Sequence, residues 1–207
     1  MRLHTIKDLV VLAADKNAEA AIQGILARHQ SLAIRQVDAQ VFVHPNRDAG
    51  CVNEAHDFLR PFTRQYRQAI VIMDFQGCGR ERLTPERIEQ DIENELSRSG
   101  WEQRAAAIVI APELEAWVWN ASRELERIVC WNNELDIYSW LRQENLLEQG
   151  QVKPDQPKES LERILRLLYR PRTSALFRQL AESVTLRNCT DRAFVKLKST
   201  LQQWFPH

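Results

Sequence analysis

The stretch AIVIMDFQGCGRERLTPERIEQ, residues 69–90, decides the fold class of this chain. It opens with a run of β-branched and other apolar residues that stops at Asp74, and a glycine-containing turn follows. Thr84 and Pro85 match the residue types preferred at a helix N-cap and at the first helical position, and acids follow in the next turns. This stretch therefore predicts a buried strand that ends at Asp74, a turn, and a helix over residues 84–100.

Strand and helix patterns alternate on both sides of that stretch. Apolar runs typical of strands buried on both faces occur at residues 8–15, 39–44, 68–74 and 104–112. Helical patterns, the first with Asn17 as its predicted N-cap, occur at residues 17–29, 51–65, 84–100 and 113–122. Alternation over about 120 residues predicts an α/β fold, with a mainly parallel sheet flanked by helices in a Rossmann-like arrangement.

The chain changes character after residue 130, where the strand patterns stop. Residues 134–147 have a helical pattern, and residues 149–160 form a connector rich in turn-forming residues. Three short helices are predicted after that, at residues 160–170, from an N-cap at Thr173 and from an N-cap at Thr190. We therefore predict an α/β core over residues 1–130 and a helical, basic C-terminal extension over residues 131–207 that packs on the core.

Charge is balanced over the whole chain but unevenly distributed along it. From Gln151 to the end, eleven Lys and Arg residues stand against five Asp and Glu residues. Arg163, Arg166 and Arg170 lie away from the apolar stripe of their predicted helix, so they could bind DNA, RNA or an acidic protein partner. The alternative is that they form the solvated face of an ordinary helix.

The cysteines and the N-terminal region indicate the compartment. The four cysteines are far apart, with no C-x-x-C pair and no histidine at zinc-ligand spacing, which favours reduced thiols and argues against a zinc site. The apolar run near the N-terminus is too short and too soon interrupted for a signal peptide or a membrane span. We therefore expect a cytoplasmic protein without membrane contact.

Acidic residues follow three of the predicted strands. Asp15 follows the first strand, Asp74 the third, and Glu113 and Glu115 the fourth. Since the carboxyl ends of parallel strands meet at one edge of a sheet, Asp15, Asp74 and Glu113 could hold Mg²⁺ or Mn²⁺ through oxygen ligands. Acids at helix starts also cap the helix and favour its dipole, so capping is the alternative for each acid taken alone.

Other polar and aromatic residues lie near the same strand ends. His44 could act as a general base and Arg47 could bind phosphate, although a surface turn is the alternative for both. Arg80, in the loop after the third strand, could clamp a phosphate or simply be solvated. Trp117 and Trp119 alternate in the helix predicted after the fourth strand, so at most one is expected to face the core squarely. We favour contact with another subunit, either a different protein or a second copy.

The order of these elements and acids resembles the Toprim domain of topoisomerases, primases, OLD-type nucleases and small maturation RNases. The signature of that family is a Glu after the first strand and an Asp-x-Asp after the third, which together bind magnesium for phosphoryl transfer. VVLAADKNAEAAIQGIL has the form of the first motif, with Ala14 in the place of the Glu and Asp15 one residue later.

Two further stretches extend this resemblance. VIMDFQGCG matches the second motif at Asp74, with Gln76 in the place of its second Asp. IVIAPELEAWVW resembles the fourth-strand motif of an uncharacterised Toprim-like family common in bacterial defence islands, matched at Glu113, Glu115 and Trp117. More narrowly, DLVVLAADKN, DFQGCGRE and CTDRAFVKLKSTLQQWFP are similar to one small subunit of a multi-gene bacterial anti-phage system built around DNA methylation.

The resemblance implies a Toprim-like fold and a role in host defence. Because both metal-binding motifs are broken, the expected role is a binding or adaptor subunit that contacts the other subunits of a defence complex. The alternative is a Mg²⁺- or Mn²⁺-dependent nuclease built from the acids at the strand ends, with a nearby base to assist. The residues of that nuclease site would be Asp74, Glu113, Glu115, Lys16 and His44.

Overall fold

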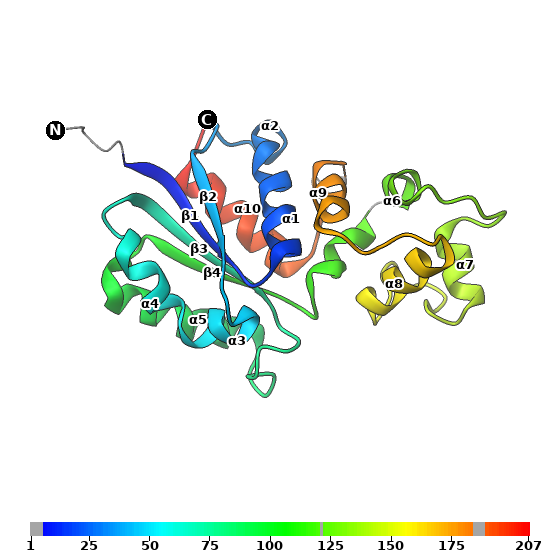
Figure 1. Ribbon diagram of the computed structural model, residues 1–207, viewed down its shortest axis with the longest axis horizontal. Helices are drawn as coiled ribbons and strands as arrows, with labels where there is room; N and C mark the ends of the chain where they lie inside the picture. Colours follow the sequence, from blue (N-terminus) through cyan, green and yellow to red (C-terminus); the bar gives the residue numbers. More distant parts are fainter. Residues whose placement is uncertain (1–5, 121, 184–188) are drawn as a thin grey trace.

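The computed structural model describes residues 6–120, 122–183 and 189–207 (Figure 1). Four strands form one all-parallel sheet in the order β2-β1-β3-β4. The strands are β1 (Lys7–Ala13), β2 (Ala39–Val43), β3 (Tyr66–Asp74) and β4 (Ala105–Ile110). This arrangement confirms the predicted α/β fold with a parallel sheet flanked by helices.

Helices cover both faces of the sheet (Figure 1). One face carries α1 (Lys16–Ala27), α2 (His29–Leu32) and α10 (Arg192–Trp204). The other carries α3 (Arg47–Asn53), α4 (Ala55–Leu59), η1 (Arg60–Phe62), α5 (Pro85–Leu96) and η2 (Ser97–Trp101). Successive strand residues point to opposite faces, so Val11 packs in the hydrophobic cluster of the first face and Leu12 in that of the second.

After β4, the regular elements of the described residues are all helices. They are η3 (Leu114–Asn120), α6 (Ser122–Val129), α7 (Ile137–Gln143), α8 (Pro157–Leu167), α9 (Ser174–Ser183) and α10. Helices α6, α7 and α8 form a lobe beside the sheet, whereas α9 packs on α1 and α10 returns to pack on β4 (Figure 1). One hydrophobic cluster includes both Ile108 of β4 and Phe194 of α10, so the last helix is a layer of the α/β core. The division at residue 130 stays a prediction.

The helix starts follow the residue types expected of N-caps, with two changes of position. Thr84 caps α5 as predicted, because its side chain accepts the N–H of Arg87 and Pro85 is the first helical residue. Helix α1 is capped by Asp15 rather than Asn17, and α10 by Asp191 rather than Thr190. In both changes an aspartate in extended backbone conformation accepts two main-chain N–H groups, which satisfies donors that the helix leaves free.

The expectation for the two tryptophans after β4 is wrong. Trp117 and Trp119 are both buried, with 7% and 2% of their surface exposed. The segment is a 3₁₀ helix rather than an α-helix, and helices of the C-terminal part cover it on more than one side. The indole N–H of Trp117 binds Asp191, and that of Trp119 binds the carbonyl of Pro157. These rings therefore join the C-terminal part to the sheet.

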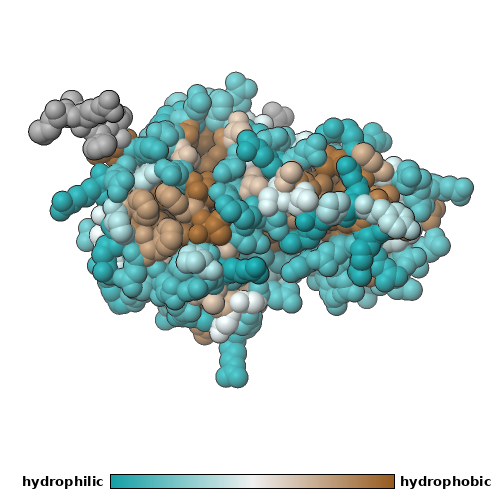
Figure 2. All heavy atoms as spheres, in the orientation of Figure 1, coloured by the Kyte–Doolittle hydropathy of each residue, from teal (hydrophilic) through white to brown (hydrophobic). Residues whose placement is uncertain are grey.

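Hydrophilic residues cover most of the face seen in Figure 2, and an apolar area lies over the outer strand β2, all of whose residues are half-buried. Within the described residues, no helix combines the length and the apolar composition needed to span a bilayer.

Candidate functional site

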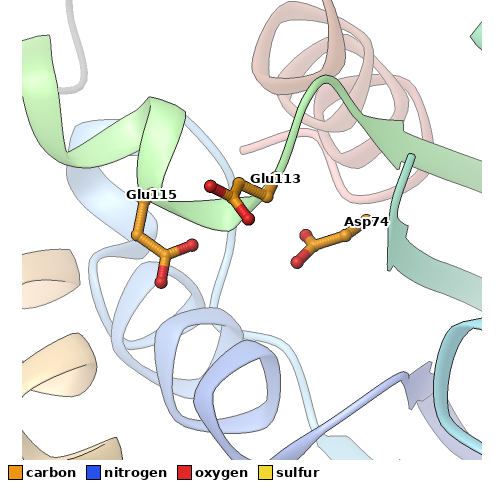
Figure 3. Close-up of side chains that lie close together, drawn as sticks. All are labelled: Asp74, Glu113 and Glu115. Carbon is orange, nitrogen blue, oxygen red and sulfur yellow. The ribbon is translucent and has the colours of Figure 1, made fainter. Parts of the chain in front are cut away.

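Three acids converge at the carboxyl edge of the sheet (Figure 3). One oxygen of each of Asp74, Glu113 and Glu115 lies within 4.8 Å of the corresponding oxygens of the other two. Asp74 is the last residue of β3 and pairs in register with Ile110, the last residue of β4. The chain after β4 then crosses the end of β3, which is held by the hydrogen bond from the N–H of Gln76 to the carbonyl of Pro112. Sheet register and this crossing together bring the three carboxylates to one place.

Each carboxylate is anchored through one of its oxygens. Asp74 Oδ1 accepts the N–H of Leu114 at 2.8 Å, and Glu113 Oε1 accepts the N–H of Lys158 at 3.0 Å. Glu115 Oε1 accepts a hydrogen bond from Nε of Arg172 at 2.9 Å and also binds its Nη2. These anchors fix the side chains, and the carboxylates point toward a shared space (Figure 3).

The second oxygen of Glu115 has no partner. Glu115 is fully buried, yet its Oε2 makes no hydrogen bond within the described chain. A buried charged oxygen without a donor or cation costs free energy, so such atoms call for a specific explanation. A cation placed between the three acids would satisfy it.

The electrostatics of the cluster disfavour three bare carboxylates. Burial, followed by the charges of Asp48, Glu115 and Asp15, raises the pKa of Asp74 well above its usual value, although the N–H of Leu114 opposes the shift. Burial and the charge of Glu115 raise the pKa of Glu113, and Lys158 opposes that shift. The cluster therefore either holds a proton or requires a positive ion.

Two basic residues from the C-terminal part already offset some of this charge. Arg172 forms an ion pair with Glu115, and the Nζ of Lys158 lies 3.6 Å from Oε2 of Glu113. Arg172 stands 57 residues from Glu115 in the sequence, in the connection between α8 and α9. No motif in the sequence marks it, so sequence reasoning missed it.

Asp15 lies outside this group of three. Its Oδ1 accepts the N–H groups of Asn17 and Ala18 at 2.9 and 2.8 Å, so it serves as the N-cap of α1. Its charge still contributes to the raised pKa of Asp74. The structure thus joins Asp74 and Glu113 with Glu115, where the sequence suggested Asp15 as the third ligand.

Asp48 is a further acid at this edge that sequence reasoning missed. Its Oδ1 accepts the main-chain N–H of Asp74 at 2.8 Å, and burial raises its pKa. It stands at the start of α3, after β2, so it follows a strand just as the other acids do. Its position shortly after a predicted strand, beside His44 and Arg47, is the sequence signal that could have identified it.

The predicted assisting residues have other contacts. Lys16 is exposed and pairs with Glu19 at 2.7 Å. His44 is buried, accepts the N–H of Asn46 on Nδ1, and places Nε2 3.6 Å from Glu54. Burial lowers the pKa of His44, and the charge of Glu54 only partly opposes this. No hydrogen bond or ion pair within the described residues links either side chain to the three acids.

Arg47 and Arg80 lie near the carboxyl ends of the strands, Arg47 at the start of α3 and Arg80 in the loop after β3. Arg47 is exposed at the start of α3 and has a positive φ of 49°. Its charge lowers the pKa of Asp48, against the larger effect of burial. Arg80 donates to the side-chain oxygen of Asn53 at 2.8 Å, which ties the loop after β3 to the end of α3.

Ala14 and Gln76, which stand where the Toprim motifs have acids, supply no charged ligand. Ala14 is buried, with 3% of its surface exposed, and offers no ligand atom. Gln76 is exposed and lines an open cleft of about 640 Å³ beside Glu113. Four carboxylates and two basic side chains line this cleft: Glu113, Asp155, Glu159, Glu162, Lys158 and Arg166. Its excess of acid suits a cation better than a polyanion.

The three arginines predicted to bind a partner lie on or just after α8. Arg163 pairs with Glu144 at 3.0 Å, and the Nε of Arg166 donates to the carbonyl of Glu162 at 3.4 Å. Arg170 donates to the carbonyl of Ile128 at 2.7 Å. All three remain exposed, and the last two line a groove of about 200 Å³ together with Arg172.

Comparisons with protein-family models, with curated proteins and with solved structures found no match to this chain. The site itself therefore carries the functional argument. Its three anchored carboxylates are hard oxygen donors of the kind that bind Mg²⁺ and Mn²⁺.

Proposed function

We propose that this chain is a cation-binding subunit of a bacterial anti-phage defence complex, with Mg²⁺ or Mn²⁺ held between Asp74, Glu113 and Glu115. The unpartnered Oε2 of buried Glu115, beside two further carboxylates, is the observation that carries the cation site. The defence role rests on the resemblance of the motifs around Asp74 and Glu113.

A cation explains this cluster better than proton sharing alone. One proton shared between two carboxylates would relieve one repulsion, but it would leave the third acid charged and outside that hydrogen bond. A divalent ion would contact an oxygen of all three acids at once. The anchoring bonds to Leu114 and Lys158 would hold two of these ligands in place, as outer partners do at metal sites.

A binding role is favoured over catalysis by the surroundings of the site. Ala14 supplies no acid where a Toprim enzyme has its Glu, and Gln76 is a neutral ligand where such an enzyme has its second Asp. Lys16 and His44 make their contacts elsewhere. The adjoining cleft carries more acids than bases, so a polyanionic substrate would meet repulsion there.

The cation site is tested by measuring Mn²⁺ affinity with electron paramagnetic resonance. Asp74→Asn and Glu113→Gln each keep an oxygen that can accept the main-chain N–H, so the local backbone is preserved. Each is expected to weaken Mn²⁺ binding about tenfold or more, since each removes a charged ligand. The matched control is Asp57→Asn, an exposed acid of α4, which should bind as the wild type does. Equal affinity in all three variants would count against the site.

A second candidate, a Mg²⁺- or Mn²⁺-dependent nuclease, is favoured by one observation. Asp48 places a fourth carboxyl group against the main chain of Asp74, so the edge carries more acids than one bound ion requires. When bound, the ion would polarise a phosphoryl oxygen or activate water. Cleavage of DNA and RNA strands with Mn²⁺ would be abolished by Asp74→Asn and kept by Asp57→Asn. Cleavage that persists in Asp74→Asn would exclude this site as its source.

Phage plating on a host that expresses this chain with its flanking genes separates the two candidates. If the chain is a binding subunit, Asp74→Asn keeps protection, whereas joint reversal of Arg163, Arg166 and Arg170 to Glu abolishes it. Loss of protection with Asp74→Asn, together with loss of cleavage, would instead favour the nuclease. Protection that survives the charge reversal would show that the partner binds elsewhere.

A further inference from the structure

A second open groove lies at the opposite edge of the sheet, where β1 and β3 begin and α10 ends. Its volume is about 580 Å³, within the usual range for a small-ligand site. Four arginines and a single acid line it: Arg35, Arg64, Arg67, Arg104 and Asp8. The two edges of the sheet thus carry opposite charge, acidic at the carboxyl ends of the strands and basic at the amino ends.

Two of these arginines have structural tasks. Arg35 binds both oxygens of Asp8 at 2.7 Å, and this contact lowers the pKa of Asp8. The carboxylate of Asp8 therefore stays ionised, and its negative charge offsets the positive charge of Arg35. Arg104 donates to the carbonyls of Tyr66 and Gly100 and stacks on Trp101. In the part of the chain that the structure describes, no acid pairs with Arg104, so only main-chain carbonyls offset its positive charge in the groove.

Arg64 and Arg67 form no hydrogen bond or ion pair within the described residues, although the charge of Arg67 helps to lower the pKa of Asp8. Both side chains are exposed. They stand three residues apart, just before and within the start of β3, and Arg104 lines the same groove. Two such guanidinium groups beside that of Arg104 form a site for phosphate rather than for a single carboxylate.

The groove also offers contacts that a bare anion would not use. Gln68 lines it, and its buried side-chain Oε1 has no hydrogen-bond partner among the described residues, so a turn of this side chain into the groove would let it accept a ligand N–H or O–H. Trp204 lines it as well and is only half-buried, which leaves part of its ring open for stacking. A ligand that uses all of these features carries a phosphate, a hydrogen-bond donor and a flat aromatic group.

We propose that this groove binds a nucleotide unit, with its phosphate on Arg64 and Arg67, its base against Trp204, and a base or sugar donor on Gln68. The unit comes either from a single strand of nucleic acid or from a free nucleotide. Base stacking on an aromatic ring beside a cationic groove is the usual physical basis of single-strand binding. The site is independent of the cation site, because the two share no residue and lie at opposite edges of the sheet.

Fluorescence polarisation with labelled oligothymidylate and oligouridylate tests the proposal. Arg64→Glu/Arg67→Glu should weaken binding at least about tenfold, and the slope of log affinity against log salt should fall by about 0.7, the value for one phosphate contact on a single strand. The matched control is Arg98→Glu/Arg178→Glu, which makes the same charge change at two exposed helical arginines. It should bind as the wild type does.

The source of the nucleotide is decided by competition. Displacement of the labelled strand by unlabelled strand but not by AMP or ATP supports a nucleic-acid strand, and displacement by AMP or ATP at comparable concentration supports a free nucleotide. Absence of binding to strand and nucleotide alike, or an equal loss in both double variants, would overturn the proposal. The Asp74→Asn variant keeps Arg64 and Arg67, so oligonucleotide binding is measured independently of Mn²⁺ binding. The cation site and the nucleotide groove can therefore be refuted separately.

Discussion

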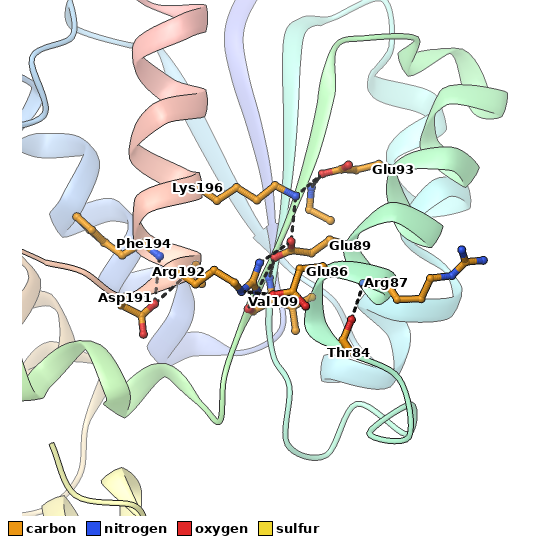
Figure 4. Close-up of polar contacts among 12 residues, drawn as sticks. Thr84, Glu86, Arg87, Glu89, Glu93, Val109, Asp191, Arg192, Phe194 and Lys196 are labelled. Atoms are coloured by element: carbon orange, nitrogen blue, oxygen red, sulfur yellow. Dashed lines mark hydrogen bonds and ion pairs between the residues drawn. The ribbon is translucent and has the colours of Figure 1, made fainter. Parts of the chain in front are cut away.

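Glu89 of α5 binds the main chain of β4 at the outer edge of the sheet, where its Oε1 accepts the N–H of Val109 at 2.8 Å. β4 is the last strand of the sheet, so this N–H has no strand partner. Arg192 of α10 reaches the same carboxylate from the other face, at 2.8 and 3.0 Å (Figure 4). The two helix layers therefore meet around the edge of β4.

Other charged side chains complete this edge. Glu93 accepts the N–H of Ala107 at 2.9 Å, and Arg192 donates to the carbonyl of Val109 at 2.7 Å. Lys196 bridges Glu89 and Glu93 at 3.1 and 2.7 Å (Figure 4). An outer strand with free main-chain groups can pair with other chains, and here side chains occupy those groups.

Glu89→Ala should lower the free energy of unfolding by about 2–3 kcal/mol, because it leaves the N–H of Val109 without an acceptor and removes the buried partner of Arg192 and Lys196, which keep only Glu86 and Glu93. Urea unfolding followed by circular dichroism measures this. Glu86→Ala is the control, since Glu86 is exposed and binds Arg192 at 2.9 Å from outside the edge. Its cost should be about 1 kcal/mol or less. Equal costs for the two variants would contradict the structural role given to Glu89.

In the protein without bound metal, Asp74 and Glu113 are predicted to contribute a loss of stability as the pH rises above about 4. Asp74 and Glu113 have raised pKa values in the folded state, so the folded chain holds protons that the unfolded chain has released. At these two groups the unfolded state binds fewer protons in that range, so their contribution to the free energy of unfolding falls with pH until the raised pKa values are passed, whereas His44, with its lowered pKa, contributes the opposite slope. Thermal unfolding in EDTA across this range measures the slope.

Asp74→Asn should flatten that slope and raise the Tm at pH 7–8 by roughly 2–4 °C, because it removes a buried charge but keeps an acceptor for Leu114. Mn²⁺ should stabilise the wild type by about 2.7 kcal/mol at a concentration of 100 Kd, and the variant much less. A variant with lower stability than the wild type at every pH would show that the carboxylate of Asp74 supports the fold instead of straining it.

Local sequence patterns were enough for the elements of the sheet but not for their order. The apolar run that ends at Asp74 and the Thr84–Pro85 start of α5 depend on residues close in sequence, and the structure confirms both. The order β2-β1-β3-β4 and the return of α10 to the sheet depend on packing between distant segments. The same holds for the hydrogen bond from the N–H of Val109 in β4 to Glu89, because in the local sequence Glu89 is only one of several acids on a predicted helix.

The candidate site was likewise predictable only where it depends on local sequence. The positions of Asp74 and Glu113 follow from where their strands end, which the sequence marks. Glu115, which the sequence also placed after the fourth strand and in the nuclease alternative, joins them on a 3₁₀ helix where an α-helix was predicted. Arg172 reaches Glu115 only because the lobe of α6, α7 and α8 brings a distant connection back to the sheet edge.

Gly50→Ala tests the packing of His44. A Cβ at residue 50 would lie 2.0 Å from Nδ1 of His44, which is buried and packs on Phe58 with ring centroids 5.4 Å apart. The ring cannot move away freely, so we expect a loss of about 1–3 kcal/mol despite the better helix propensity of Ala. In the His44→Ala background the same substitution should cost clearly less in urea unfolding, and the remaining cost reflects the Cβ of Asn46, which would lie 2.9 Å from the new Cβ. A similar cost in both backgrounds would place the strain elsewhere in α3.

Arg172→Gln should have opposite effects on stability and on cation affinity. In EDTA the variant leaves Glu115 buried without its ion pair, so the free energy of unfolding should fall by about 3–5 kcal/mol. With Mn²⁺ present, the loss of a competing positive charge should tighten binding, and the rise in Tm on adding Mn²⁺ should exceed that of the wild type. Arg178→Gln, which removes an exposed arginine paired with Glu182 on α9, is the control and should change neither quantity measurably. Differential scanning calorimetry with EDTA and with Mn²⁺ gives both readings. A variant that loses stability but gains no response to Mn²⁺ would mean that Arg172 neutralises Glu115 permanently, and that no cation shares that carboxylate.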